Sequence, residues 1–207
     1  DKERVDSVRF LIKEMKSAGC SVQVLDHNLD EVKGIIITAG DWAISTNYDI
    51  AKANNATRFF HDAQFNRQGI TEFYDNIEAK LAEFGISIKQ TSYDVLEHQF
   101  QEEESLLYQM VEEKYKESGY NVPSEKEYSI RVDVRSITVL YRIRQGVVSQ
   151  TIQDSKHIMI TQNGAVANVC KKYESNRSIN SGHIPVCISA DLFGTVWVNG
   201  SAQTRGE

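Results

Sequence analysis

The chain has 207 residues, of which 41% are apolar and 25% are charged, so it is long enough to bury a hydrophobic core. Its net charge of −6 argues against a strongly basic nucleic-acid-binding protein, although metal ions can compensate an acidic catalytic site. No run approaches the ~18 apolar residues of a membrane span and no secretory leader is recognisable, so we expect a cytoplasmic protein without a membrane partner.

The three cysteines are Cys20, Cys170 and Cys187. They have neither zinc-site spacing nor an even count, so buried, reduced thiols are expected rather than a disulfide framework or a zinc site. The sequence begins at Asp1 without Met and soon enters a helical pattern. This start suggests an excised fragment, whose missing N-terminal part would be its partner in a larger protein.

The first half of the chain alternates helical and strand-like patterns. These patterns predict helices and strands in turn over 5–18, 21–25, 29–44, 71–84 and 86–89. Thr71 is the expected cap of the fourth element. Between these elements, 45–70 is polar and mixed, which predicts weak helix and loop, as an insertion or a lid.

The second half continues the alternation. It predicts helices and strands over 92–117, 127–144, 148–155, 157–161, 165–173 and 184–189. A polar loop is expected over 174–183, a last apolar segment over 191–198 and a disordered tail over 200–207. The whole pattern predicts an α/β fold in one domain over 1–199, with a mostly parallel central sheet of about four strands flanked by helices.

Two acids lie on the predicted inward-facing sides of their helices. Asp133 shares a helix face with the apolar residues Ile137 and Leu140, and a buried, unpaired carboxylate costs several kcal/mol unless it has a partner or a metal. Glu31 has a similar place at the start of the helix after the first strand. The open alternative for both is a first-turn acid that supports its own helix N-terminus.

Polar residues also follow the predicted strands. Asn163 stands after a strand that ends in Thr161 and before a helix, so it is either a helix N-cap or a neutral oxygen ligand. Asp26, after the first strand, has mainly a structural interpretation. Arg142 and Arg144, on a last helical turn, suit either a phosphate backbone or the helix dipole.

Motifs with stricter requirements are absent from the sequence. It has no GxxxxGK[ST] phosphate loop, no strand-linked GxGxxG, no HExxH and no GxSxG elbow. Its five histidines are scattered, so no nucleophilic constellation can be assembled from them by spacing.

The chain resembles the PIN-like family of metal-dependent nucleases. The resemblance rests on three stretches, which are Asp30-Glu31-Val32, Val132-Asp133-Val134-Arg135-Ser136-Ile137 and Ile158-Met159-Ile160-Thr161-Gln162-Asn163. The segments 141–144 and 184–189 are similar to a subgroup of large, mostly uncharacterised bacterial proteins. Two departures from the family are that Asn163 stands where an acid is usual, and that the first acid of the family has no counterpart unless it is Asp26, so an N-terminal strand is expected upstream.

The resemblance implies a hydrolase that cuts phosphodiester bonds, more often in RNA than in DNA, in a setting of stress or phage defence. It implies that Mg²⁺ or Mn²⁺ is held by Glu31, Asp133, Asn163 and Asp26, with Thr161 as a supporting hydrogen-bond donor.

Two alternatives stay open. One is a catalytically degenerate PIN-like module that binds nucleic acid or a protein partner. The other is an unrelated flavodoxin-like receiver or hydrolase fold, which predicts that Glu31, Asp133 and Asn163 lie more than ~10 Å apart, too far to share a metal. A homo-oligomer is compatible with each of them.

Overall fold

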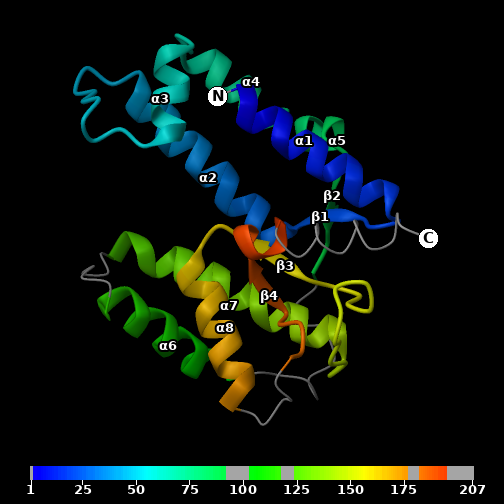
Figure 1. Ribbon diagram of the computed structural model, residues 1–207. Helices are drawn as coiled ribbons and strands as arrows, with labels where there is room; N and C mark the ends of the chain where they lie inside the picture. Colours follow the sequence, from blue (N-terminus) through cyan, green and yellow to red (C-terminus); the bar gives the residue numbers. More distant parts are fainter. Residues whose placement is uncertain (1, 92–102, 118–123, 177–181, 195–207) are drawn as a thin grey trace. The chain divides into compact units, whose positions relative to one another are not determined.

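The computed structural model describes residues 2–91, 103–117, 124–176 and 182–194. The chain divides into two compact units, unit 1 over Asp1–Thr91 and unit 2 over Ser92–Glu207. Each unit combines helices with one pair of parallel strands, so the chain is mixed α/β (Figure 1). The described residues do not show the four strands joined in one central sheet, and a single PIN-like domain over 1–199 stays a prediction.

Unit 1 consists of five helices and two strands within residues 2–91. In chain order these are α1 (Lys2–Ser17), β1 (Val22–Leu25), α2 (Asp26–Ala43), α3 (Asn55–Asp62), α4 (Arg67–Asp75), α5 (Ile77–Glu83) and β2 (Ile86–Lys89). The two strands are those that the sequence predicts. They pair in parallel, with Val22 opposite Ile86 and Leu25 opposite Lys89, so both strands end at the same edge of the pair.

The segment between α2 and β2 is more helical than the sequence predicts. Within 45–70, Asn54 caps α3 by accepting from Thr57 N at 2.9 Å, and Asn66 caps α4 by accepting from Gly69 N at 2.8 Å. Thr71 is therefore not a cap, and its hydroxyl bonds the Arg67 carbonyl within α4. The prediction of a single helix over 71–84 is wrong, because the helix is interrupted at Asn76, between α4 and α5.

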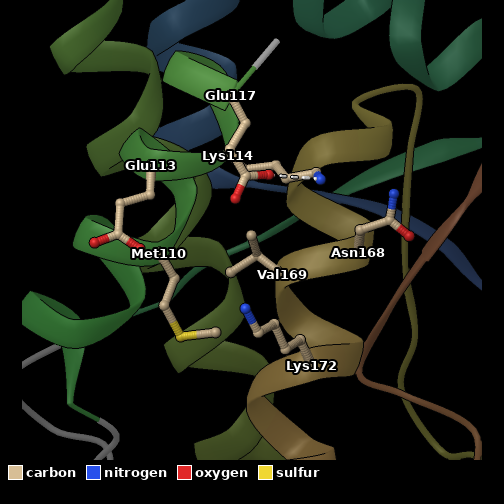
Figure 2. Close-up of a pocket in the computed structure, with 7 residues that line it drawn as sticks. All are labelled: Met110, Glu113, Lys114, Glu117, Asn168, Val169 and Lys172. Atoms are coloured by element: carbon tan, nitrogen blue, oxygen red, sulfur yellow. Dashed lines mark hydrogen bonds and ion pairs between the residues drawn. The ribbon is translucent and has the colours of Figure 1, made fainter.

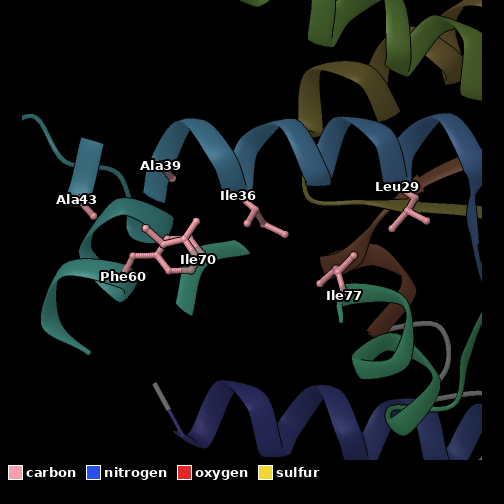
Figure 3. Packing of buried hydrophobic residues seen from close by; sticks show 7 residues of the cluster. All are labelled: Leu29, Ile36, Ala39, Ala43, Phe60, Ile70 and Ile77. Carbon is pink, nitrogen blue, oxygen red and sulfur yellow. The ribbon is translucent and has the colours of Figure 1, made fainter. Parts of the chain in front are cut away.

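The core of unit 1 lies between α2 and the helices that follow it (Figure 3). Its buried members project from α2, α3, α4 and α5, and they are Leu29, Ile36, Ala39, Ala43, Phe60, Ile70 and Ile77. The small residues on α2 let α3 and α4 approach closely. Phe60 is 2% exposed and meets Phe65 and Phe73 edge to face, at ring centroid distances of 5.2 and 5.4 Å.

α2 and α4 pack closely at Gly40. A Cβ at this position would lie 2.5 Å from Cγ2 of Ile70, a buried, β-branched side chain that cannot easily move away. We expect Gly40→Ala to lower the free energy of unfolding by about 1–2 kcal/mol, because overpacking exceeds the gain in helix propensity.

Gly34 provides the matched control on the same helix, since a Cβ there would meet nothing within 4 Å. Gly34→Ala is expected to raise the free energy of unfolding by roughly 0.5–1 kcal/mol. Urea unfolding followed by circular dichroism measures both variants. Stabilisation by Gly40→Ala would contradict the close packing of α2 on α4.

Unit 2 contains three long helices and two short strands within its described residues. They are α6 (Glu104–Glu117), α7 (Ser124–Arg144), β3 (Met159–Thr161), α8 (Gly164–Asn176) and β4 (Cys187–Ser189). β3 pairs in parallel with β4, with Met159 opposite Cys187 and Thr161 opposite Ser189. Both strands match the sequence prediction and end at one edge, with α8 as the connection between them.

α7 is the central helix of unit 2. Ile137 and Val139 are 0% exposed although they lie on different sides of the helix, and the neighbouring polar residues Ser136 and Thr138 are equally buried. The buried hydroxyl of Thr138 has a hydrogen-bond partner, because it donates to the Glu104 carboxylate of α6 at 3.1 Å. Because α7 is enclosed on several sides, its side chains reach both α6 and the strands.

The prediction of a helix over 148–155 is wrong. This segment forms turns, and Ser149 makes an antiparallel bridge with Ile184, whose N–H donates to the Ser149 carbonyl at 2.7 Å. Thr151 and Asp154 bond each other through their side chains at 2.6 Å. Short polar side chains that bond locally in this way compete with a helix.

Several expectations fall outside the described residues. These are the first part of the helix predicted over 92–117, up to residue 102, the end of the apolar segment 191–198, and the tail 200–207. No helix in the described part of the chain combines the length and the apolar character that a membrane crossing requires.

Candidate functional site

The polar end of β3 is the place where the sequence predicts a site. Thr161 ends the strand, and its hydroxyl oxygen accepts a hydrogen bond from the Asn163 N–H at 3.0 Å. Asn163 in turn begins α8, because its carbonyl accepts the first helical bond, from Ala167. The turn from strand to helix is thus fixed by local hydrogen bonds.

Asn163 has two functions at once. Its side-chain oxygen accepts from Val166 N at 3.4 Å, a long contact in the position of an N-cap. Its amide nitrogen faces the other way and donates to Asp133 Oδ2 at 3.2 Å and to the Tyr115 hydroxyl at 2.6 Å. An aspartate could cap the helix but could not donate to Asp133, so an asparagine suits this position for structural reasons.

Asp133 is half-buried on α7 and lies on the same helix face as Ile137, as the sequence predicts. The charge of Asp133 also influences the pKa of Cys187 on β4. Burial raises the pKa of the Cys187 thiol to about 12, with further contributions from Asp133 and Glu174. Asp133 therefore interacts with two neighbouring elements. It accepts a hydrogen bond from Asn163 at the start of α8, and its charge contributes to the raised pKa of Cys187 on β4.

Tyr115 and Lys126 were not found by sequence reasoning. Tyr115 lies near the end of α6 and is half-buried, and Lys126 Nζ lies 5.2 Å from the centroid of its ring, a cation–π geometry. Neither belongs to a motif. A tyrosine on an amphipathic helix is ordinarily a packing residue, so only the three-dimensional contact with Asn163 distinguishes Tyr115.

Asp26 belongs to a separate cluster at the ends of β1 and β2. Its carboxylate accepts from Thr91 N at 3.0 Å, from the Thr91 hydroxyl and from His27 N at 2.9 Å. Burial opposes the charge, but these hydrogen bonds outweigh it and lower the pKa of Asp26 to about 2. The carboxylate thereby ties the start of α2 to Thr91, two residues after the end of β2.

The low pKa of Asp26 predicts a pH-dependent contribution to stability. The pKa of folded Asp26 is below the ordinary aspartate value of 3.8, so the contribution is full above about pH 4 and is lost as the pH falls toward 2. We expect Asp26→Asn to lower the free energy of unfolding by roughly 1–2 kcal/mol at pH 7, with allowance for screening by solvent, and to have little effect at pH 2.

Asp30→Asn, an exposed acid on the same helix, is the control and should have little effect at either pH. Urea unfolding of the wild type and both variants at a series of pH values measures these effects. An effect of Asp26→Asn that does not change with pH would argue against an ionised Asp26 as the source.

Glu31 is half-buried on α2, five residues after Asp26, so the two side chains point to different sides of the helix. Both belong to unit 1, whereas Asp133, Thr161 and Asn163 belong to unit 2. A shared metal site with Glu31 and Asp26 stays a prediction. The contact of Asp133 with Asn163 is the expected one, and it disagrees with the flavodoxin-like alternative for this pair.

A buried polar network in unit 2 was also missed. Glu174, which the sequence assigns to a polar loop, lies on α8 and is 2% exposed. Its carboxylate accepts from the Tyr141 hydroxyl at 2.6 Å and from Val186 N at 3.0 Å, and lies 2.5 Å from His183 Nε2. Burial raises the pKa of the Tyr141 hydroxyl, as do the neighbouring Cys170 and Glu174.

Arg142 and Arg144 are 3% and 6% exposed, so neither lies on a surface that faces a phosphate backbone. Arg144 donates through Nε to the His157 carbonyl at 2.6 Å, and through its two terminal nitrogens to Ile184 and Pro185 carbonyls at 3.0 and 3.2 Å. Burial lowers the pKa of Arg144. The guanidinium thus holds the segments that enter β3 and β4.

A shallow hollow lies between α6 and α8 (Figure 2). Its volume of about 110 Å³ is below the roughly 300–1,000 Å³ of small-molecule sites. Residues from both helices line it, namely Met110, Glu113, Lys114, Glu117, Asn168, Val169 and Lys172. Asp133, Thr161 and Asn163 are absent from its described lining, so the hollow is distinct from the polar cluster.

Metal-binding side chains do not gather into a complete cage in the described residues. No group of three or more His, Cys, Asp and Glu side chains that could hold a metal ion occurs there. Cys170 and Cys187 are buried and Cys20 is exposed, and all three are free thiols. The expected burial is therefore confirmed for Cys170 and Cys187 and is wrong for Cys20.

Comparison with known proteins adds no relative. The chain matches no family model, no curated protein sequence and no solved structure.

Proposed function

We propose that the chain is a metal-dependent phosphodiester hydrolase of the PIN-like type that acts on nucleic acid, RNA more than DNA, with Asp133 as its central carboxylate. The observation that carries the proposal is the contact between Asp133 and Asn163, at the polar end of β3. This is where ligands of α/β proteins bind. The proposal includes a PIN-like sheet of four strands.

Asp133 alone could supply the protein carboxylate that a divalent cation needs. Mg²⁺ keeps several waters and is commonly held by one or two carboxylates together with substrate phosphates. Bound at Asp133, Mg²⁺ or Mn²⁺ would activate a water and stabilise charge on the phosphate. Asn163 holds the Asp133 carboxylate in place, and Thr161 fixes the backbone of Asn163. The Asn163 oxygen would reach a cation only if its amide turned away from α8.

Cleavage of labelled single-stranded RNA and DNA by the full chain, with Mn²⁺ and with EDTA, tests this proposal. We expect Asp133→Asn to lower the Mn²⁺-dependent rate on the order of 100-fold or more, because the carboxylate is lost with little change of shape. Asp154→Asn, at an exposed acid of the same unit, should keep the wild-type rate. A wild-type chain without Mn²⁺-dependent cleavage, or a fully active Asp133→Asn variant, contradicts the proposal.

Asn163→Asp forms the second arm of the test. Two carboxylates this close repel each other without a cation, so the variant should melt at a lower temperature than the wild type in EDTA and recover with Mn²⁺. Asn168→Asp makes the same chemical change at an exposed position of α8 and should show no such recovery. Equal responses of the two variants to Mn²⁺ would argue against a cation at Asp133.

The second candidate is a non-catalytic PIN-like module that binds nucleic acid or a protein partner. It is favoured by the amide of Asn163, which already satisfies Asp133 Oδ2 without a metal. This candidate predicts nucleic-acid binding that Mn²⁺ and Asp133→Asn leave unchanged, and no cleavage. The experiment above therefore separates the two.

A further inference from the structure

We infer that Tyr115 and Lys126 form the part of this site that contacts the phosphate backbone of a nucleic acid, an inference that rests on the proposed function. Tyr115 joins the Asp133 cluster through Asn163, whose amide nitrogen lies 2.6 Å from the phenol oxygen. Tyr115 lies on α6, Asp133 lies on α7, and Asn163 immediately precedes α8. They meet at the end of unit 2 where β3 gives way to α8.

The direction of this hydrogen bond decides what Tyr115 can do. The nitrogen of a primary amide can only donate, so the phenol oxygen is the acceptor and the phenol proton points away from Asn163. The orientation of the amide is supported by its oxygen, which faces Val166 N. Across the ranges that the structure describes, Asn163 is the one hydrogen-bond partner of this hydroxyl. Its proton is thus suited to an acceptor on a ligand.

Lys126 supplies the charge that such a ligand would need. Its side chain is exposed, and its ammonium lies 5.2 Å from the centroid of the Tyr115 ring. It stands seven residues before Asp133 on α7, which places both on one helix face roughly 10 Å apart. A tyrosine hydroxyl and a lysine are both ordinary partners of phosphate oxygens, and such contacts orient a strand without reading its sequence.

The same two helices contain a matched pair that lacks the link to Asn163. Tyr108 lies two turns before Tyr115 on α6, and the Arg131 guanidinium lies 5.0 Å from the centroid of its ring. This second pair has the same chemistry at another place. It therefore separates a specific role of Tyr115 and Lys126 from a general effect of cations and aromatic rings on α6 and α7.

The test is equilibrium binding of a labelled single-stranded RNA to the full chain in EDTA, so that the readout does not depend on cleavage. We expect Tyr115→Phe and Lys126→Gln each to weaken binding on the order of tenfold. Lys126→Gln should also reduce the slope of log affinity against log salt by about 0.7, the value for one phosphate contact. Tyr108→Phe and Arg131→Gln should bind as the wild type does.

A strand with an uncharged methylphosphonate backbone gives the decisive control. The wild type and Lys126→Gln should bind it equally, because the backbone no longer carries the negative charge that the Lys126 ammonium would contact. Wild-type affinity of both Tyr115→Phe and Lys126→Gln for RNA, or equal losses in the Tyr108 and Arg131 variants, overturns the inference. Lys126 is exposed, so its variant decides the matter if Tyr115→Phe fails to fold.

Failure of the proposed function has a different signature. If the wild type binds RNA but does not cleave it with Mn²⁺, and the Tyr115 and Lys126 variants still lose binding, the hydrolase proposal is lost and the backbone contact stands.

Discussion

Replacement of Glu174 by alanine is expected to lower the free energy of unfolding by roughly 3–5 kcal/mol, because a buried carboxylate that several polar groups share as their acceptor is lost. The carboxylate is 2% exposed and is the common acceptor for Tyr141, His183 and Val186 N. Its loss would leave three polar groups without their partner, in a space too enclosed for water to replace every bond. Urea unfolding followed by circular dichroism measures the effect.

Two further variants make this expectation specific. Glu174→Gln keeps the size of the side chain but has one acceptor oxygen, so its loss should be smaller than that of Glu174→Ala. Glu113→Ala, at an exposed acid of α6, should change the free energy of unfolding by less than about 0.5 kcal/mol. Hydrogen exchange of the Val186 amide should accelerate in Glu174→Ala. A loss of less than about 1 kcal/mol in Glu174→Ala would contradict the network.

Replacement of Arg144 by alanine is expected to lower the free energy of unfolding by roughly 2–4 kcal/mol. The guanidinium donates to three carbonyls in two separate segments, at His157, Ile184 and Pro185. Those carbonyls lie in half-buried residues, so water can compensate part of the loss. Urea unfolding measures the change, and faster exchange in the segments around β3 and β4 would locate it.

Lysine is the informative replacement for Arg144. It keeps the positive charge, but an ammonium on a flexible stem cannot reproduce a planar fork that reaches three acceptors. Arg144→Lys should therefore lose more than half of the stability that Arg144→Ala loses. Arg135→Ala, at an exposed arginine on the same helix, should stay within about 1 kcal/mol of the wild type. Full stability of Arg144→Lys would show that charge alone is sufficient.

The four strands in the described part of the chain could be predicted from the sequence because each is a short apolar run between polar turns. How the strands pair could not be predicted with the same success. Periodicity shows which residues are buried, but not which strands share an edge. The helix prediction over 148–155 failed for a related reason, since the bridge from Ser149 to Ile184 links positions far apart in sequence.

The candidate site was predictable in part. The contact of Asp133 with Asn163 followed from an inward acid and a polar strand end, which are local patterns. Tyr115 could not be found, because its role depends on how α6 lies against the start of α8. Glu174 was assigned to a loop because a polar run ends α8, and its burial comes from the residues around His183 and Val186.

The sequence distance between paired strands bears on the order of folding. Val22 and Ile86 are 64 residues apart, whereas Met159 and Cys187 are only 28 apart. Loop closure becomes more costly by about 0.6 kcal/mol for each doubling of length, so pairing of β3 with β4 is favoured by roughly 0.7 kcal/mol of chain entropy. We expect β3, α8 and β4 to associate early, which would place Asn163 at the end of its strand before β1 and β2 have met.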